Sequence, residues 1–294
     1  MCRTTTVITE LTDKRVKQTE DVLLRLSLYK EKIGRKRMRF RPCIDIHNGK
    51  VKQIVGGSLK DAGDQAEENY ISEQDSTFYA KMYKKDNLRG GHIILLNPAG
   101  SEYYEATRKQ ALAALQEFPG GMQIGGGVTA ENAKEYLDAG ASHVIVTSYV
   151  FREGRIRWDR LEQLLQVTGR EHLVLDLSCR KREDGAYYIV TDRWQTFTDE
   201  KLTPEFMGKL GAYCDEFLIH GVDVEGKSAG APEDLVSILA SCEGRPITYA
   251  GGIGTLEDLE RFRVQSGGKL DFTIGSALDL FGGKVAYNVV KNYH

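Results

Sequence analysis

Two aspartates stand inside short apolar runs, where carboxylates are unexpected because aspartate is depleted in β-strands. Asp45 lies in Cys43-Ile-Asp-Ile46, and Asp176 lies in Leu175-Asp-Leu177, 131 residues further along the chain. Either aspartate alone could form a structural ion pair. Two at corresponding places favour catalysis, because paired carboxylates can act as general acid and general base when their surroundings separate their pKa values.

Small residues follow four other apolar runs and could bind phosphate. Glycine lets backbone N–H groups approach an anion closely, and the N-terminus of a following helix adds its dipole. Two neighbouring turns could form one phosphate cradle, giving two cradles, although such glycines could also simply make tight turns. No Gly-x-x-x-x-Gly-Lys-Ser/Thr segment occurs, so a nucleotide P-loop is not expected. The candidate substrate-binding residues in these turns are Gly126, Gly127, Thr147, Ser148, Gly251, Gly252, Gly275 and Ser276.

The same features occur twice along the chain. The glycine pairs that begin at Gly126 and Gly251 are 125 residues apart, and Ser148 and Ser276 are 128 residues apart. These offsets are close to the separation of the two aspartates. The chain therefore reads as two similar halves, with a substrate that carries a phosphate at each end and acid–base chemistry between them.

The elements that must position these residues alternate between β-branched apolar runs and amphipathic helical stretches, which is typical of βα units. Eight strands, each followed by a helix, favour a closed α/β fold, a (β/α)8 TIM barrel built from two similar half-barrels, over an open sheet. The aspartates then lie toward strand C-termini, the face where such barrels place their chemistry. The predicted strands are Phe40–His47, His92–Asn97, Met122–Gly126, His143–Ser148, Leu173–Ser178, Phe217–Asp223, Ile247–Gly251 and Phe272–Ser276. The predicted helices are Phe78–Tyr83, Tyr104–Glu117, Glu131–Ala139, Trp158–Val167, Glu205–Ala212, Glu233–Leu239 and Leu256–Phe262, with a weakly indicated eighth after Gly283.

Composition excludes several classes of function. The formal net charge of −2 argues against a nucleic-acid or membrane-surface binder. The five cysteines are scattered, without a Cys-x-x-C pair or a Cys/His cluster at metal-ligand spacing, so neither a disulfide framework nor a metal site is expected. No apolar run is long enough for a membrane span. We expect a cytoplasmic protein.

The first 37 residues differ from the rest of the chain. They contain ten Lys/Arg and five Asp/Glu and end in Arg35-Lys-Arg37, just before Met38. They lack the apolar core of a secretory signal, and they hold many acids for an organelle transit peptide. We interpret residues 1–37 as an N-terminal extension outside the fold, and residues 38–294 as the catalytic barrel.

Four segments carry a resemblance to a known family that covers roughly Met38 to Gly283. They resemble the eukaryotic-type branch of the phosphoribosylformimino-5-aminoimidazole carboxamide ribotide (ProFAR) isomerases of histidine biosynthesis. The resemblance implies a bisphosphorylated substrate and an Amadori rearrangement of an aminoaldose to an aminoketose. The segments are Arg41-Pro-Cys-Ile-Asp-Ile-His-Asn-Gly-Lys-Val-Lys-Gln-Ile-Val-Gly-Gly57, Leu173-Val-Leu-Asp-Leu-Ser-Cys-Arg180, Leu218-Ile-His-Gly-Val-Asp-Val-Glu-Gly226 and Gly275-Ser-Ala-Leu-Asp-Leu-Phe-Gly-Gly283.

The resemblance also implies roles for individual residues. Asp176 would be the general acid that protonates the ribose ring oxygen, and Asp45 the general base that removes the C2′ proton. Trp194 would stack on the imidazole of the substrate, or would simply close the side of the barrel. No cofactor, metal, nucleic acid, membrane or obligate protein partner is implied, and we expect a monomer that binds a small-molecule substrate.

The chain departs from the commoner bacterial pattern in several places. His220 and Gly221 stand where that pattern has threonine and aspartate, so His220 either binds the substrate or caps its strand. Gln53, preceded by Lys52, stands where an arginine is common, and Asn97 replaces an acid. The long segment from Gly57 to Asp75 is predicted to be a mobile lid or a disordered polar insertion.

Two other functions remain open. The sibling cyclase subunit of imidazole glycerol phosphate synthase shares the aspartates and the glycine cradles. Cyclases typically carry a lysine where this chain has His47, which favours the isomerase. A barrel that binds a phosphosugar without catalysis is the second alternative, and the presence of both aspartates argues against it. Whether phosphoribosyl anthranilate is also a substrate is left open.

Overall fold

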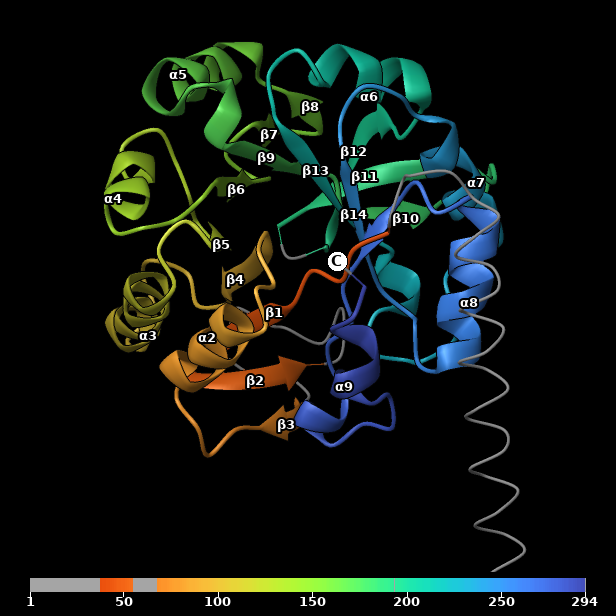
Figure 1. Ribbon diagram of the computed structural model, residues 1–294. Helices are drawn as coiled ribbons and strands as arrows, with labels where there is room; N and C mark the ends of the chain where they lie inside the picture. Colours follow the sequence, from red (N-terminus) through yellow and green to blue (C-terminus); the bar gives the residue numbers. More distant parts are fainter. Residues whose placement is uncertain (1–37, 55–67, 193, 294) are drawn as a thin grey trace, which may run out of the picture. The chain divides into compact units, whose positions relative to one another are not determined.

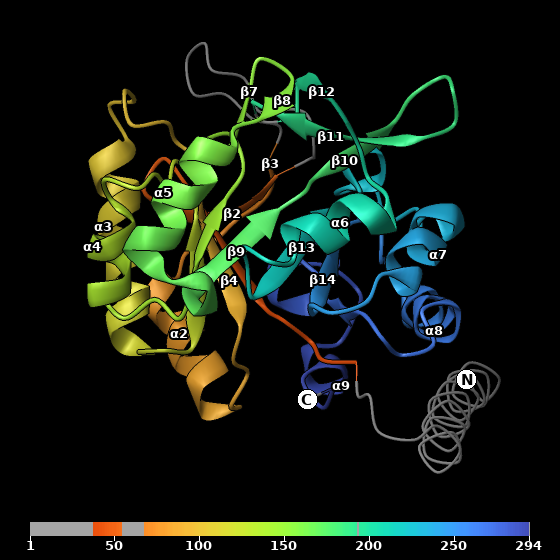
Figure 2. The same cartoon turned by 90° about the horizontal axis from the view of Figure 1, so that it is seen from above.

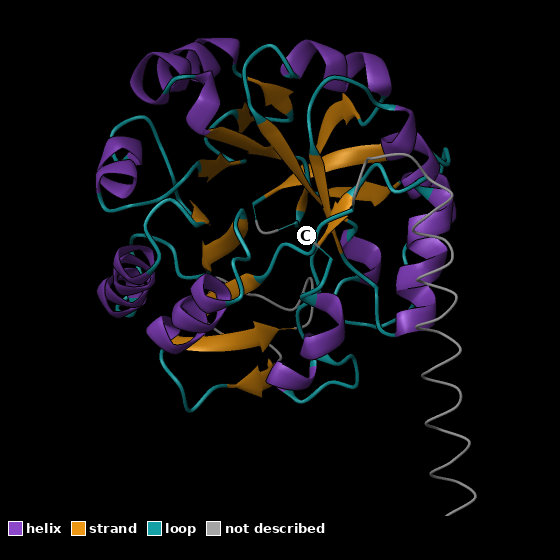
Figure 3. Cartoon of the chain, in the orientation of Figure 1, coloured by secondary structure: helices purple, strands orange, loops and turns teal. Residues whose placement is uncertain are grey.

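A computed structural model describes residues 38–54, 68–192 and 194–293, and all structural statements below concern these residues. Eight parallel strands lie in the order β15-β14-β13-β9-β6-β5-β4-β1 within one sheet, and helices surround them (Figures 1 and 3). The strands are β1 (Cys43–His47), β4 (Gly91–Leu95), β5 (Met122–Gly125), β6 (Val144–Val146), β9 (Leu173–Asp176), β13 (Glu216–His220), β14 (Ile247–Ala250) and β15 (Asp271–Phe272).

The helices follow the strands along the chain, and all seven that the sequence predicted with bounds are present. The weakly indicated eighth is a single turn, α9. The helices are α2 (Ser76–Lys85), α3 (Tyr104–Glu117), α4 (Ala133–Asp138), α5 (Trp158–Thr168), α6 (Pro204–Leu210), α7 (Glu233–Ser241), α8 (Leu256–Gln265) and α9 (Tyr287–Val290), with short 3-10 turns η2 (Arg170–His172), η3 (Val222–Val224) and η4 (Asp279–Phe281).

The first and last strands close the sheet into a barrel. The Arg41 backbone N–H donates to the Phe272 carbonyl at 2.8 Å, and the Phe272 N–H donates to the Arg39 carbonyl at 3.0 Å. Phe40 and Phe272 form the corresponding parallel bridge. The predicted closed barrel is therefore confirmed.

Strand register places both aspartates inside the barrel. Asp45 pairs with Ile94, Ile94 with Gly125, and Gly125 with Ile145 along one row. Asp176 pairs with Leu218 in a second row. Because side chains alternate across a strand, members of one row point to one face of the sheet. The interior apolar cluster of Ile145, Val174 and Leu218, with Ile94 against it, fills the space beneath them.

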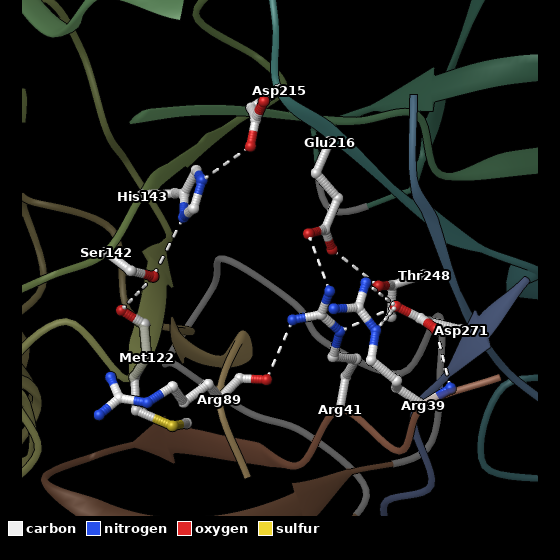
Figure 4. Close-up of polar contacts among 10 residues, drawn as sticks. All are labelled: Arg39, Arg41, Arg89, Met122, Ser142, His143, Asp215, Glu216, Thr248 and Asp271. Carbon is white, nitrogen blue, oxygen red and sulfur yellow. Dashed lines mark hydrogen bonds and ion pairs between the residues drawn. The ribbon is translucent and has the colours of Figure 1, made fainter. Parts of the chain in front are cut away.

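A buried ion network lies at the opposite end of the barrel, where the strands begin (Figure 4). Arg41 Nε donates to Asp271 at 3.0 Å, and its Nη2 lies 3.4 Å from Glu216, which also accepts a hydrogen bond from Thr248 at 2.7 Å. Arg39 holds the same Asp271 through its backbone N–H at 2.8 Å. These contacts join β13, β14 and β15 to the residues that lead into β1.

An antiparallel extension of the barrel sheet and two small separate sheets were not predicted. β2 (Lys50–Ile54) pairs with β1 and with β3 (Glu68–Ile71), β7 (Phe151–Arg152) pairs with β8 (Arg155–Ile156), and β11 (Tyr187–Thr191) pairs with β10 (Cys179–Lys181) and β12 (Thr196–Lys201). Figure 2 shows β7, β8, β11 and β12 together at one end of the barrel.

The predicted long loop from Gly57 to Asp75 is wrong in its last part. Glu68–Ile71 forms a strand against β2, and the Asp75 side chain caps α2 by accepting the Phe78 N–H. Residues 57–67 lie outside the described residues, as do residues 1–37, so the lid and the extension stay predictions. The predicted strand Phe217–Asp223 was also too long, because Val222–Val224 turns into η3.

Candidate active site

A cavity of about 580 Å³ lies where the barrel strands end. Five strands contribute its polar side chains, which shows that residues scattered over the sequence meet at one place. The residues that line it include Asp45, Gln53, Gly126, Gly127, Thr147, Ser148, Asp176, Asp192, Trp194, His220 and Glu225.

Asp45 is held in a setting that favours its neutral form. Its carboxylate accepts a hydrogen bond from Gln53 Nε2 at 3.4 Å, across the β1–β2 hairpin. Burial, and then the nearby Glu225 carboxylate, raise the pKa of Asp45 to about 7. A carboxylate with a pKa near neutrality is a stronger base than an ordinary aspartate and still ionises at physiological pH.

The surroundings of Asp176, in contrast, favour its ionised form. Its Oδ1 accepts hydrogen bonds from the Ser178 backbone N–H at 2.9 Å and from Ser178 Oγ at 2.7 Å, and it lies 3.6 Å from His220 Nδ1. Burial opposes the charge of this carboxylate, but the His220 imidazolium and the Ser178 donors outweigh it and hold the pKa of Asp176 below its ordinary value. The two aspartates thus differ in protonation, as acid–base chemistry requires.

His220 is the cationic partner in this arrangement. Burial opposes its charge, but the Asp176 carboxylate, with smaller effects of Glu225 and Asp45, raises the pKa of His220 to about 9. The His92 ring lies 6.2 Å away, and burial, helped by the charge of His220, lowers the pKa of His92 to about 3. His220 is therefore charged at neutral pH, and His92 is neutral.

Glu225 is a site residue that the sequence reasoning missed. It follows η3 and lines the cavity, and its buried Oε2 has no hydrogen-bond partner among the described residues. Burial raises the pKa of Glu225, while His220 opposes that shift. Glu225 lies in the segment Leu218–Gly226, one of the four that carry the family resemblance. Its place in that segment was the only sign in the sequence that it could belong to the site.

Trp194 lies at the tip of the β11–β12 hairpin and covers the cavity beside His220, with 5.7 Å between ring centroids. Its backbone φ is +68°, a left-handed conformation that is rare for a bulky residue and that concentrates at functional sites. The Asp192 N–H in the same turn donates to Ser148 Oγ at 3.3 Å. The hairpin is thus tied to the turn after β6.

The first predicted cradle lies in the cavity. Gly126 and Gly127 have φ of +98° and +71°, and a Cβ on Gly126 would stand 2.1 Å from the Leu95 carbonyl oxygen. A Cβ on Gly127 would meet nothing within 4 Å. Glycine is therefore required for packing at position 126, whereas position 127 opens into free space. Thr147 and Ser148 line the same side.

The second predicted cradle is not brought into this cavity. Two of its glycines, Gly251 and Gly252, follow β14, and Gly275 and Ser276 follow β15; none of these residues lines the cavity. A Cβ on Gly252 would stand 2.2 Å from the Gly230 carbonyl oxygen, and one on Gly275 would stand 2.2 Å from Gln53 Oε1. Close approach of neighbouring chain explains the lack of side chains at both positions.

The contacts of Asn97, Lys52 and Gln53 show what these residues do at the positions where the chain departs from the bacterial pattern. Asn97 accepts hydrogen bonds from the Asn48 N–H at 2.8 Å and from Thr107 Oγ1 at 2.7 Å, so it holds the β1–β2 turn. Lys52 forms an ion pair with Glu68. Gln53, rather than a cation, faces Asp45.

The described part of the chain holds no cluster of three His, Cys, Asp or Glu side chains with metal-binding geometry. None of its helices is both long and apolar enough to cross a membrane. The cytoplasmic location stays a prediction.

The fold and the site define an α/β barrel whose cavity holds two carboxyl groups with opposite pKa shifts beside a candidate anion site. The sequence profile described as "Histidine biosynthesis protein" matches residues 39–285, and the chain belongs to this family of (β/α)8 barrels. It is similar to proteins named 1-(5-phosphoribosyl)-5-((5-phosphoribosylamino)methylideneamino)imidazole-4-carboxamide isomerase. The chain is accordingly an isomerase.

Three such relatives show the extent of the similarity. The Medicago truncatula protein, whose name places it in the chloroplast, is 50% identical over 261 residues, which cover 87% of this chain and 82% of the relative. The Neurospora crassa protein is 46% identical over 248 residues (84% and 94%). The Saccharomyces cerevisiae protein is 43% identical over 259 residues (86% and 95%).

Proposed function

We propose that this isomerase converts the aminoaldose ProFAR into the corresponding aminoketose by an Amadori rearrangement in histidine biosynthesis. The observation that carries the proposal is the pair Asp45 and Asp176, which share one cavity but hold their protons with opposite tendencies. The rearrangement needs a proton donor for the ring oxygen and a base for the C2′ proton. A site with two differently tuned groups supplies both.

Asp45 serves as the base. Its pKa of about 7 lets it ionise at neutral pH and still accept a carbon-bound proton more readily than an ordinary aspartate. Proton donation to the ring oxygen comes from the Asp176 side of the cavity, where Asp176 and His220 lie 3.6 Å apart. The opened sugar is then a Schiff base, and loss of the C2′ proton gives an enolamine that becomes the ketone.

The substrate is held at its ends and over its base. The turns after β5 and β6, with Gly126, Gly127, Thr147 and Ser148, bind one phosphate. The turns after β14 and β15 do not line the cavity, but they lie on the opposite side of the barrel by strand order, and we assign the other phosphate to them. Trp194 stacks on the imidazole of the substrate, and its left-handed backbone fixes the ring over the cavity.

A coupled absorbance assay with the aminoaldose tests the proposal. We expect the enzyme alone to consume the aminoaldose and accumulate the aminoketose, and further product to form only when a cyclase and ammonia are added. Direct formation of the cyclase products by this chain would identify it as the sibling enzyme. Binding of the aminoaldose without turnover would identify a non-catalytic phosphosugar-binding barrel.

A further inference from the structure

We propose that His220 is the residue that delivers the proton to the ring oxygen, and that Asp176 is a positioning residue that keeps the His220 imidazole charged and oriented. The inference rests on the proposed function and deepens it. It assigns the acid step to a side chain that replaces threonine of the commoner bacterial pattern, and it gives the sequence's candidate acid a different task.

The surroundings of Asp176 suit an anion. Its Oδ1 accepts two hydrogen bonds from Ser178, at 2.9 Å and 2.7 Å, and the third neighbour of that oxygen is His220 Nδ1 at 3.6 Å. All three neighbours are donors or a positive charge. A carboxyl group that must carry a proton before each turnover is favoured by acceptors or apolar groups around it rather than by donors. The environment of Asp176 stabilises the carboxylate instead.

The surroundings of His220 suit a cation. Its side chain is 12% exposed, and carboxylates face it from three elements: Asp176 from β9, Asp45 from β1 and Glu225 from the loop after η3. The neutral His92 of β4 adds no charge at 6.2 Å, and Trp194 covers the ring at 5.7 Å. No lysine or arginine is among the described residues that line the cavity.

The orientation of the ring also fits proton donation. Nδ1 lies 3.2 Å from Ser178 Oγ and 3.6 Å from Asp176 Oδ1. This arrangement leaves Nε2 as the nitrogen that can reach a ligand. An aspartate on one ring nitrogen and a reacting atom on the other is the general arrangement by which a carboxylate orients a histidine and supports its charge.

The proton transfers balance without a co-reactant. The His220 Nε2 proton passes to the ring oxygen while the C1′–O4′ bond breaks and the nitrogen lone pair forms a C1′=N iminium. Asp45 takes the C2′ proton, the C2′–H electrons form the C1′=C2′ bond, and the C=N electrons return to nitrogen. The enol hydroxyl proton then returns to His220 as the C2′=O bond forms, and C1′ takes the proton from Asp45. Both residues end in their starting states.

The test is the pH dependence of kcat/KM, which reports the acid and base of the free enzyme. We expect a bell with limbs near 7, from Asp45, and near 9, from His220. His220→Gln should abolish the alkaline limb and lower kcat about 10²–10⁴-fold with little change in KM. His172→Gln, which changes an exposed histidine whose Nδ1 bonds the Ser142 carbonyl at the other end of the barrel, should match the wild type.

Asp176→Asn separates the two assignments. If Asp176 only supports His220, the alkaline limb moves down toward the ordinary histidine value of about 6.5. Because Asp45 loses its basic form below about 7, a reduced activity then remains in a narrow optimum near neutral pH. If Asp176 is itself the acid, no pH restores activity, and the inference is overturned. ¹⁵N NMR titration of the His220 imidazole in the ligand-free enzyme gives a second readout. We expect His220 to titrate well above neutrality in the wild type and lower in Asp176→Asn.

Other outcomes are equally decisive. An unchanged alkaline limb in folded His220→Gln would overturn the inference while the proposed function stands. A wild-type enzyme that does not turn over the aminoaldose would instead refute the proposed function, whatever the imidazole titration shows. If His220→Gln does not fold, the NMR titration and the Asp176→Asn profile still decide the matter.

Discussion

Replacing Asp45, the proposed catalytic base, should stabilise the protein, because its charge is unfavourable in the folded state. Its folded pKa is about 7 against an ordinary value of 3.8. Folded protein therefore binds more protons than unfolded protein between these two pH values, and stability falls as pH rises through that window. Asp45→Asn keeps the size of the side chain and can still accept the Gln53 hydrogen bond, but it carries no charge.

The size of the effect follows from the difference between the folded and unfolded pKa values of Asp45. That difference is roughly three units, and each unit is worth about 1.4 kcal/mol, so at pH 8 the buried charge lowers the free energy of unfolding by at most about 4 kcal/mol. Charges at buried sites in proteins interact as if the effective dielectric constant were about 20, so we expect less than this ceiling, a gain of about 1–3 kcal/mol. Below pH 4 both side chains are neutral, and the difference between the two proteins should vanish.

Urea denaturation at pH 4 and pH 8, followed by circular dichroism, measures both values. Asp176→Asn is the matched control with the opposite sign. Its folded pKa is held below the ordinary value, so the carboxylate contributes stability above that value and loses it as pH falls through the folded pKa. Asp176→Asn should therefore destabilise the protein at pH 8. Equal stability of wild type and Asp45→Asn at pH 8, or a gain that does not depend on pH, would refute this electrostatic account.

Three further changes test other parts of the molecule. Gly127→Asp should raise KM on the order of tenfold to a hundredfold, because the new carboxylate enters the first anion site. Gly127→Asn is the control: asparagine is uncharged and tolerates positive φ, so it should raise KM far less. Equal KM values for the two variants would show that no phosphate binds at this turn. A chain that begins at Met38 should keep its melting temperature within a few degrees and its activity, and a larger loss would show that the extension supports the barrel. Arg41→Met leaves the buried Glu216 without a cationic partner and leaves Asp271 with Arg39 alone. Urea denaturation should therefore show a loss of about 3–5 kcal/mol in the free energy of unfolding. An unchanged midpoint would show that the ion network adds nothing to stability.

The barrel was predictable because its signal is local. Each strand is a short apolar run that is followed by a helical stretch. Repetition of this unit along the chain predicts a parallel sheet of βα units. Asp45 and Asp176 could be placed at one end of the barrel because parallel strands share the direction in which they end. Strand ends were less accurate, since the last residues of several runs turn into loops at the cavity. The strand predicted over Phe272–Ser276 is one example, because β15 covers only Asp271–Phe272.

The details of the site depend on contacts between distant segments, which spacing does not encode. Thr196–Lys201 is largely polar, and it becomes strand β12 only because β11 pairs with it. That pairing places Trp194 over His220. The charge of His220 in turn depends on Asp176, 44 residues earlier, and on Glu225, which the sequence reasoning did not single out.

The two ends of the barrel use buried charge differently, and the difference bears on the mechanism. At the closed end, Arg39 and Arg41 face Asp271 and Glu216, so positive and negative charges match and a stable network results. At the mouth, the described lining residues hold three buried carboxylates and His220 as their cation. Burial raises the pKa values of Asp45 and Glu225, so a cation that forms beside them favours their ionised forms and is in turn stabilised by them; the protonated Schiff base of an opened aminoaldose is such a cation. Backbone N–H groups at the glycine turns can meanwhile bind the phosphates without adding positive side chains to the centre. The buried carboxyl groups that cost stability at the mouth are therefore placed where the proposed reaction would develop its positive charge.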